Sequence, residues 1–137
     1  MFDLIPLTLF FVITVFHVYM GFGGQLNYDY ILPKVNGKDL PFHTSMAIPV
    51  AICLGLSTSC FGYKVGLLNQ SLLGSYNDLW LLLTAYALFI RGCFGLIVFH
   101  IFNRLIDNTL FKVWDLRVYT PLTLFLGFSS FKALGLI

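Results

Sequence analysis

The sequence predicts an all-α integral membrane protein, a four-helix bundle with two longer loops on one, cytoplasmic, side. Hydrophobic residues make up 58% of the 137 residues, charged residues only 10%, and the mean hydropathy is +0.87. A soluble domain has about 25% charged residues. The apolar residues also fall into four runs, each near the ~20 residues that a helix needs to cross a bilayer. We therefore expect residues 1–137 to form a single membrane domain, which excludes a nucleotide-binding fold, a receptor ectodomain and a DNA-binding module.

The first span is predicted over residues 4–22. Pro6 falls in its first turn, where the missing backbone N–H of proline costs nothing. The only charge before this run is Asp3, so the basic start of a signal peptide is absent and we expect the span to be retained. A polar loop follows from Gly23 to His43.

The second and third spans are predicted over residues 46–68 and 79–102. Lys64 lies near the end of the second span, where its ammonium group can extend to the lipid headgroups. Arg91 lies near the middle of the third span, about 18 Å along the helix from Leu79. It is the one charge that the sequence places deep in the membrane.

The fourth span is predicted over residues 118–137, after a second polar loop from Asn103 to Arg117. Pro121 falls in the first turn of this span, and Lys132 lies near its outer end. Cytoplasmic loops of membrane proteins carry more Lys and Arg than external loops. The two polar loops contain five of these residues, and the opposite side has Lys64 and Lys132. We therefore expect both long loops in the cytoplasm and both termini in the periplasm.

Three spans carry a stripe of small or polar residues at helical spacing. Small residues let helix backbones approach closely, so these stripes predict the faces on which the helices pack. The stripes are Thr14, His17, Gly21 and Gly24 in the first span; Ala51, Gly55, Ser59, Gly62 and Gly66 in the second; and Thr120, Thr123, Gly127 and Ser130 in the fourth. The large apolar side chains on the other faces are expected to contact lipid.

Arg91 and His17 are the candidate ligand-binding residues nearest the middle of the membrane. His17 lies about 20 Å along its span from Leu4, so the two side chains fall in nearly the same layer. A charge at that depth costs at least ~2.5–3.5 kcal/mol and is usually turned to a partner or a water-filled cavity. No acidic residue is expected inside a span. Arg91 would then either pair with a loop carboxylate, Asp115 or Asp107, or face backbone and hydroxyl oxygens or a bound anion.

Other polar residues gather toward the same cytoplasmic half, so a site would open inward under the two long loops. They are Tyr19, Gln25, His43, His100, Arg104, Asp115, Arg117 and Tyr119. From the whole set we select six candidate ligand-binding residues: Arg91, His17, Tyr19, Asp115, Arg117 and Tyr119.

No catalytic residue, metal site or cofactor is predicted. Cys53 and Cys60 are about 10 Å apart along one helix, too far for a disulfide, and no CxxC motif is present. His100 is half a helical rotation from Arg91, which argues against a haem held between facing histidines. No nucleophile–base pair, phosphate loop or paired intramembrane carboxylate is recognisable. A net charge of +2 offers no polybasic patch for nucleic acid.

Several motifs resemble a bacterial family of four-span membrane proteins known as domain of unknown function 3995. The motifs of the first half are His17-Val18-Tyr19, Gly23-Gly24 and Leu32-Pro33-Lys34-Val35-Asn36-Gly37-Lys38. Those of the second half are Arg91 and Thr109-x-Phe111-x3-Asp115-x-Arg117-x-Tyr119-Thr120-Pro121-Leu122. Where the family pattern has an aromatic and an acidic residue, this chain has Met20 and Gly95. The resemblance implies a four-span fold, and it implies no reaction.

The chain is also similar to small inner-membrane proteins of Gram-negative bacteria named for ciprofloxacin tolerance and linked to envelope integrity. This similarity implies a non-catalytic inner-membrane protein that supports envelope integrity or fluoroquinolone tolerance by binding a lipid-like amphiphile or a membrane partner. Two alternatives stay open. One is an accessory subunit of a larger membrane complex, or a homo-oligomer. The other is a membrane enzyme or carrier that acts on an amphipathic anionic substrate through Arg91 and His17.

Overall fold

The computed structural model describes residues 3–24, 34–35, 38–39, 46–101 and 109–137. The helices are α1 (Leu4–Gly21), α2 (Ala47–Lys64), α3 (Asn77–Ile101), α4 (Thr109–Trp114) and α5 (Thr120–Ala133). A 3-10 turn, Gly74–Tyr76, precedes α3, and a π-helical segment, Asp115–Tyr119, joins α4 to α5. Strands β1 (Lys34–Val35) and β2 (Lys38–Asp39) form a short antiparallel pair in the chain segment that connects α1 to α2.

The described helices support the predicted membrane architecture. Within the described residues, three segments are long and apolar enough to cross a membrane: Leu4–Gly21, Ala47–Lys64 and Gly74–Ile97. Helix α5 alone is shorter, with 14 residues. It continues α4 and the π segment without a break, however, and at ~1.5 Å per residue the stretch from Thr109 to Ala133 is about 37 Å long.

The start of this last helical stretch corrects the sequence prediction. We expected a loop as far as Arg117 and a span from Val118, but the helix begins at Thr109. Lys112, Asp115 and Arg117 lie on this helix, although their charges made the segment resemble a loop. Asp115 is therefore a helical residue that faces the bundle, not a loop residue that folds inward.

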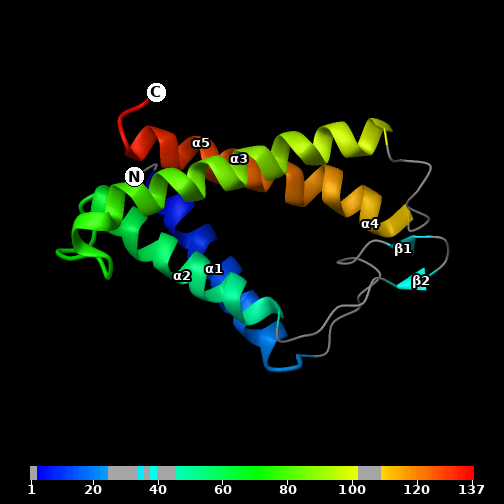
Figure 1. The fold of residues 1–137 in the computed structure, drawn as a ribbon, viewed down its shortest axis with the longest axis horizontal. Helices are drawn as coiled ribbons and strands as arrows, with labels where there is room; N and C mark the ends of the chain where they lie inside the picture. Colours follow the sequence, from blue (N-terminus) through cyan, green and yellow to red (C-terminus); the bar gives the residue numbers. More distant parts are fainter. Residues whose placement is uncertain (1–2, 25–33, 36–37, 40–45, 102–108) are drawn as a thin grey trace.

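The four helical stretches form two antiparallel hairpins, α1 with α2 and α3 with α5, arranged as a V (Figure 1). The hairpins meet at the end that holds both termini, and they separate toward the end from which the two long connections leave. At the closed end, buried side chains from all four stretches form one core: Phe10, Cys60, Phe61, Leu81 and Leu126.

Polar side chains reinforce the junction between the hairpins. Ser57 on α2 is buried and shares a 2.8 Å hydrogen bond with the Thr84 hydroxyl on α3. The indole Nε1 of Trp80 donates to the same Ser57 oxygen at 3.1 Å. Ser57 was not part of the predicted stripe, yet it joins the two hairpins.

The predicted packing stripes are confirmed inside the helices but not at their ends. Five stripe residues are buried: Ala51, Gly62, Thr120, Gly127 and Ser130. Gly24 and Gly66 lie beyond the ends of α1 and α2. Gly66 has a φ of 75°, and the following backbone N–H, of Leu67, donates to the Gly62 carbonyl at 2.9 Å. A glycine at this place ends the helix, because it adopts the left-handed conformation without a steric penalty.

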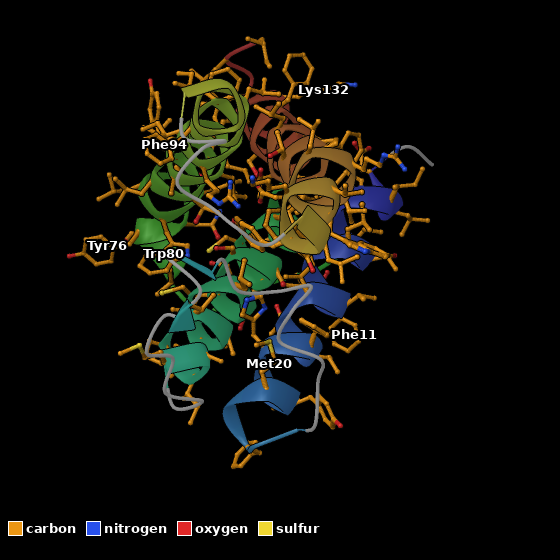
Figure 2. The ribbon with its side chains drawn as sticks, turned by 90° about the vertical axis from the view of Figure 1, so that its right-hand side faces the viewer. Phe11, Met20, Tyr76, Trp80, Phe94 and Lys132 are labelled. Carbon is orange, nitrogen blue, oxygen red and sulfur yellow. The ribbon has the colours of Figure 1, made fainter. Side chains whose placement is uncertain are left out.

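Large apolar side chains cover the outer surface, as expected for helices in contact with lipid. Phe11 and Phe94 are 60% and 58% exposed and point away from the bundle (Figure 2). Tyr76, beside the start of α3, also points outward. A ligand-binding site is therefore expected between the two hairpins, in the interior of the V.

Candidate functional site

A cavity of about 290 Å³ lies between the two hairpins at their open end. Figure 2 looks into this end of the molecule, where Met20 lies between α1 and α2. The lining residues come from every helical stretch: Phe16, His17, Met20, Met46, Ala47, Val50, Arg91, Phe111 and Tyr119. Most of them are apolar, so the cavity suits the apolar part of a ligand and presents a few polar groups to the rest.

Arg91 pairs with Asp115 at the wall of this cavity. The guanidinium Nη2 donates a hydrogen bond to Asp115 Oδ1, and the two groups form an ion pair. The Arg91 side chain is 43% exposed, whereas that of Asp115 is 15% exposed. The carboxylate therefore compensates the charge of Arg91 from the more buried side, and much of the Arg91 side chain remains accessible. Of the partners predicted for Arg91, the structure selects Asp115.

The π segment places Asp115 beside the cavity. Phe111, Asp115 and Tyr119 are four residues apart, so they lie on one face of the helical stretch. Phe111 and Tyr119 both line the cavity, which puts Asp115 at its wall between them. Single π turns inside α-helices are rare and occur often at functional sites.

Gly95 leaves the space that this arrangement needs. A Cβ atom on Gly95 would collide with the Thr120 hydroxyl oxygen and would lie 2.9 Å from Arg91 Nη1. A larger residue would therefore have to displace Thr120 or the guanidinium. In this chain the acid that meets Arg91 comes from the facing helix, at Asp115, and not from position 95.

His17 brings a second polar group to the cavity, from the opposite hairpin. Its side chain is half-buried, and Nδ1 lies 2.8 Å from the Ile13 carbonyl oxygen one turn earlier on α1. The Phe16 ring meets the imidazole edge to face, with 6.0 Å between the ring centroids. The prediction that His17 and Arg91 lie in one layer is consistent with their sharing this cavity.

The structure brings together four of the six candidate residues. Arg91, His17 and Tyr119 line the cavity, and Asp115 pairs with Arg91. Tyr19 and Arg117 are exposed and do not line it. Of the other polar residues named from the sequence, the side chains of Gln25, His43, His100, Arg104 and Asp107 lie outside the described residues.

Sequence reasoning missed the apolar lining. Phe16, Met46 and Val50 carry no signal that distinguishes them from lipid-facing residues. Met20 and Phe111 were named in the comparison with the family motifs, but not as site residues. The common feature of all these residues is position near the open ends of α1, α2 and α4, which only the splay of the hairpins makes significant.

The cavity presents a guanidinium, an imidazole and apolar side chains to a ligand. In the described part of the chain, no three His, Cys, Asp or Glu side chains lie together as a possible metal site. A guanidinium can fork onto a carboxylate or a phosphate, and the aromatic and aliphatic lining can contact a hydrocarbon chain. The cavity thus combines an anchor for a polar head with a surface for an apolar tail.

The comparison with known protein families identifies a matching family. A family model described as "Protein of unknown function (DUF3995)" matches residues 10–130, which include His17, Arg91, Asp115 and Tyr119. No curated protein and no solved structure matches the sequence. The family match covers well over half of the chain and confirms the family named from the sequence motifs. The chain therefore belongs to the DUF3995 family.

Proposed function

We propose that the protein is a non-catalytic protein of the bacterial inner membrane that binds a lipid-like amphiphile between its two hairpins, and in this way supports envelope integrity or antibiotic tolerance. The observation that carries the proposal is the partly exposed Arg91 side chain in the wall of an otherwise largely apolar cavity. A polar group at membrane depth is costly, and its usual role is to meet a substrate, an ion or a partner.

The size and position of the cavity support the same function. Small-molecule sites usually measure about 300–1,000 Å³, and this cavity of about 290 Å³ lies at the lower end of that range. It fits the head of an amphiphile and the adjoining part of its chain. The remainder of the chain would lie between the two hairpins, along their apolar inner faces.

Native mass spectrometry of the protein purified in mild detergent tests this proposal. We expect about one retained amphiphile per chain, and loss of that molecule in Arg91→Met. Lys64→Met is the matched control, because Lys64 forms its 2.8 Å ion pair with Asp78 at the closed end of the bundle. Equal retention in both variants would contradict a site at Arg91. A stoichiometric protein partner in place of a lipid would favour the accessory-subunit function.

A survival assay tests whether the Arg91 cavity is needed for tolerance in the cell. A strain that lacks the protein should be more sensitive to a fluoroquinolone and to detergent, and Arg91→Met should fail to restore growth where Lys64→Met restores it. Full restoration by Arg91→Met would separate any tolerance function from this cavity.

The proposed orientation places both long connections in the cytoplasm and both termini in the periplasm. Cysteines introduced at Asn36 and Asn108, which lie outside the described residues, should be shielded from an impermeant thiol reagent in intact cells. A cysteine at Gln70, on the connection between α2 and α3, should react. The background needs replacement of Cys53, Cys60 and Cys93. Labelling at position 36 from outside would reverse the orientation.

A further inference from the structure

The two polar groups of the cavity differ in what they offer to a ligand. Arg91 presents a guanidinium, which has five N–H donors and no acceptor. Asp115 accepts the bond from Nη2, and the Arg91 side chain remains 43% exposed. The guanidinium has further N–H donors that can bind a second acceptor, and they favour a charged oxygen because such bonds are the stronger ones.

The tautomer of His17 determines whether its Nε2 atom can donate a hydrogen bond to a ligand. A carbonyl oxygen only accepts hydrogen bonds, so Nδ1 must carry the proton in its 2.8 Å contact with the Ile13 oxygen. In the neutral ring, Nε2 then has only a lone pair, which repels an anionic oxygen. Protonation of the imidazole converts Nε2 into a donor.

The charge balance of the cavity couples these two groups. Among the described residues around the cavity, the charged or titratable side chains are His17 on α1, Arg91 on α3, and Asp115 and Tyr119 on the π segment; α2 contributes uncharged Met46, Ala47 and Val50. Arg91 and Asp115 together have no net charge. A monoanionic ligand would therefore leave the cavity with one uncompensated negative charge, unless His17 is protonated. Unpaired charge is costly in an apolar site.

We infer that the ligand is a single-chain amphiphile with an anionic phosphate head, held by Arg91 and by protonated His17, and bound more tightly as the pH falls. This inference rests on the proposed function. A phosphate fits because its oxygens point in tetrahedral directions and can meet donors on α1 and α3 together, whereas the acceptor sites of a carboxylate lie in one plane. The small cavity favours one chain over two.

The sign of the pH dependence follows from the protonation of His17. Histidine changes charge between about pH 5 and pH 8. An anion binds better to the protonated form, so its affinity is highest at low pH and decreases as the pH rises. A suitable probe is lysophosphatidylglycerol, because its diester phosphate keeps one negative charge throughout this range and any change must come from the protein.

The test measures binding of this probe to the full chain in mild detergent at about pH 5.5 and about pH 8. We expect roughly tenfold tighter binding at the lower pH, about the contribution of one hydrogen bond to a charged group. His17→Gln should remove the pH dependence, and Arg91→Met should weaken binding at both pH values. Lys64→Gln, which removes a positive charge at the far end, should bind as the wild type does.

Three further probes define the head and the source of the ligand. Lysophosphatidylcholine has the same phosphate and chain with a compensating ammonium group, and it should bind more weakly. Glycerophosphate, which has no chain, should not compete, and a fatty acid should bind less tightly than the phosphate probe. Any of these three binding as well as lysophosphatidylglycerol would overturn the inference.

The remaining outcomes separate the inference from the proposed function. Wild-type binding that does not change with pH, or a pH dependence that persists in His17→Gln, would overturn the inference and leave an amphiphile site intact. Failure of every single-chain probe to bind the wild-type protein at either pH would overturn both.

Discussion

The two helix hairpins of this protein pack by different means. In the α3–α5 hairpin, the helix backbones come close together: a Cβ atom on Gly127 would lie 3.0 Å from the backbone nitrogen of Phe89 and 3.1 Å from the carbonyl oxygen of Ala85. In the α1–α2 hairpin, side chains fill most of the space between the helices. The backbones approach at the end of α1, where a Cβ on Gly21 would lie 2.6 Å from the Ile48 side chain and 3.4 Å from its backbone nitrogen. The Phe10 and Phe61 rings lie 5.8 Å apart, and a Cβ on Gly55 would meet only a Thr14 methyl group, at 3.6 Å.

This difference corresponds to a division of roles at the cavity. Helices in a membrane are held together by close packing and polar contacts, because lipid removes the hydrophobic driving force. The closely packed α3–α5 hairpin fixes the backbones that hold Arg91 and Asp115. The α1–α2 hairpin supplies His17 and most of the apolar wall. The charged pair thus belongs to the same half of the molecule as the close contact at Gly127.

The largest effect is expected from a substitution that disrupts the packing of the α3–α5 hairpin. Gly127→Leu should lower the free energy of unfolding by more than about 3 kcal/mol, because the new side chain meets backbone atoms of α3 that cannot move aside. Alanine at positions 127 and 55 gives a matched pair, and only the change at 127 should be clearly destabilising. Thermal unfolding in mild detergent measures both. Equal losses at the two positions would show that the hairpins pack equally closely.

A smaller effect is expected from the charged pair. Arg91→Met should destabilise the protein by about 1–2 kcal/mol, between the values for exposed and for buried pairs, because Asp115 loses its partner in a largely buried place. Replacing Asp115 by Leu in the same chain should restore much of this loss, since neither charge then remains. A double-mutant cycle by thermal unfolding measures the coupling. A single Met variant as stable as the wild type would show that the pair contributes nothing to folding.

The smallest effect concerns the junction between the hairpins. Ser57→Ala removes the bond to Thr84 and leaves the Trp80 N–H without this acceptor. We expect a loss of about 0.6–1 kcal/mol, the usual value for such bonds in a membrane. Thr8→Val is the control, because the exposed Thr8 hydroxyl bonds only within its own helix, to the Leu4 carbonyl. The same small shift in melting for both variants would mean that Ser57 does not join the hairpins.

The sequence predicted three helices closely and the fourth incorrectly. Helices α1, α2 and α3 lie within the runs expected at 4–22, 46–68 and 79–102, apart from two additional residues, Asn77 and Asp78, at the start of α3. The fourth begins at Thr109 because Lys112, Asp115 and Arg117 are tolerated on a helix next to the cavity and the surface. A hydropathy profile assigns charged residues to loops. It contains no information on ion pairs, such as the one between Asp115 and Arg91. Gly66 was misassigned for a related reason, since a glycine that ends a helix and a glycine that packs inside it look the same in sequence.

The sequence by itself determined the membrane class, the number of helical stretches and the candidate residues of the site. These depend on the local run of apolar residues, and a helix satisfies its own backbone hydrogen bonds in lipid without help from the rest of the chain. Only the tertiary structure decided that Arg91 meets Asp115, that His17 shares their cavity, and that Tyr19 and Arg117 lie outside it. These contacts depend on the rotation of each helix about its axis and on the angle between the hairpins. Both are set by how glycines, hydroxyls and aromatic rings from distant parts of the chain fit together.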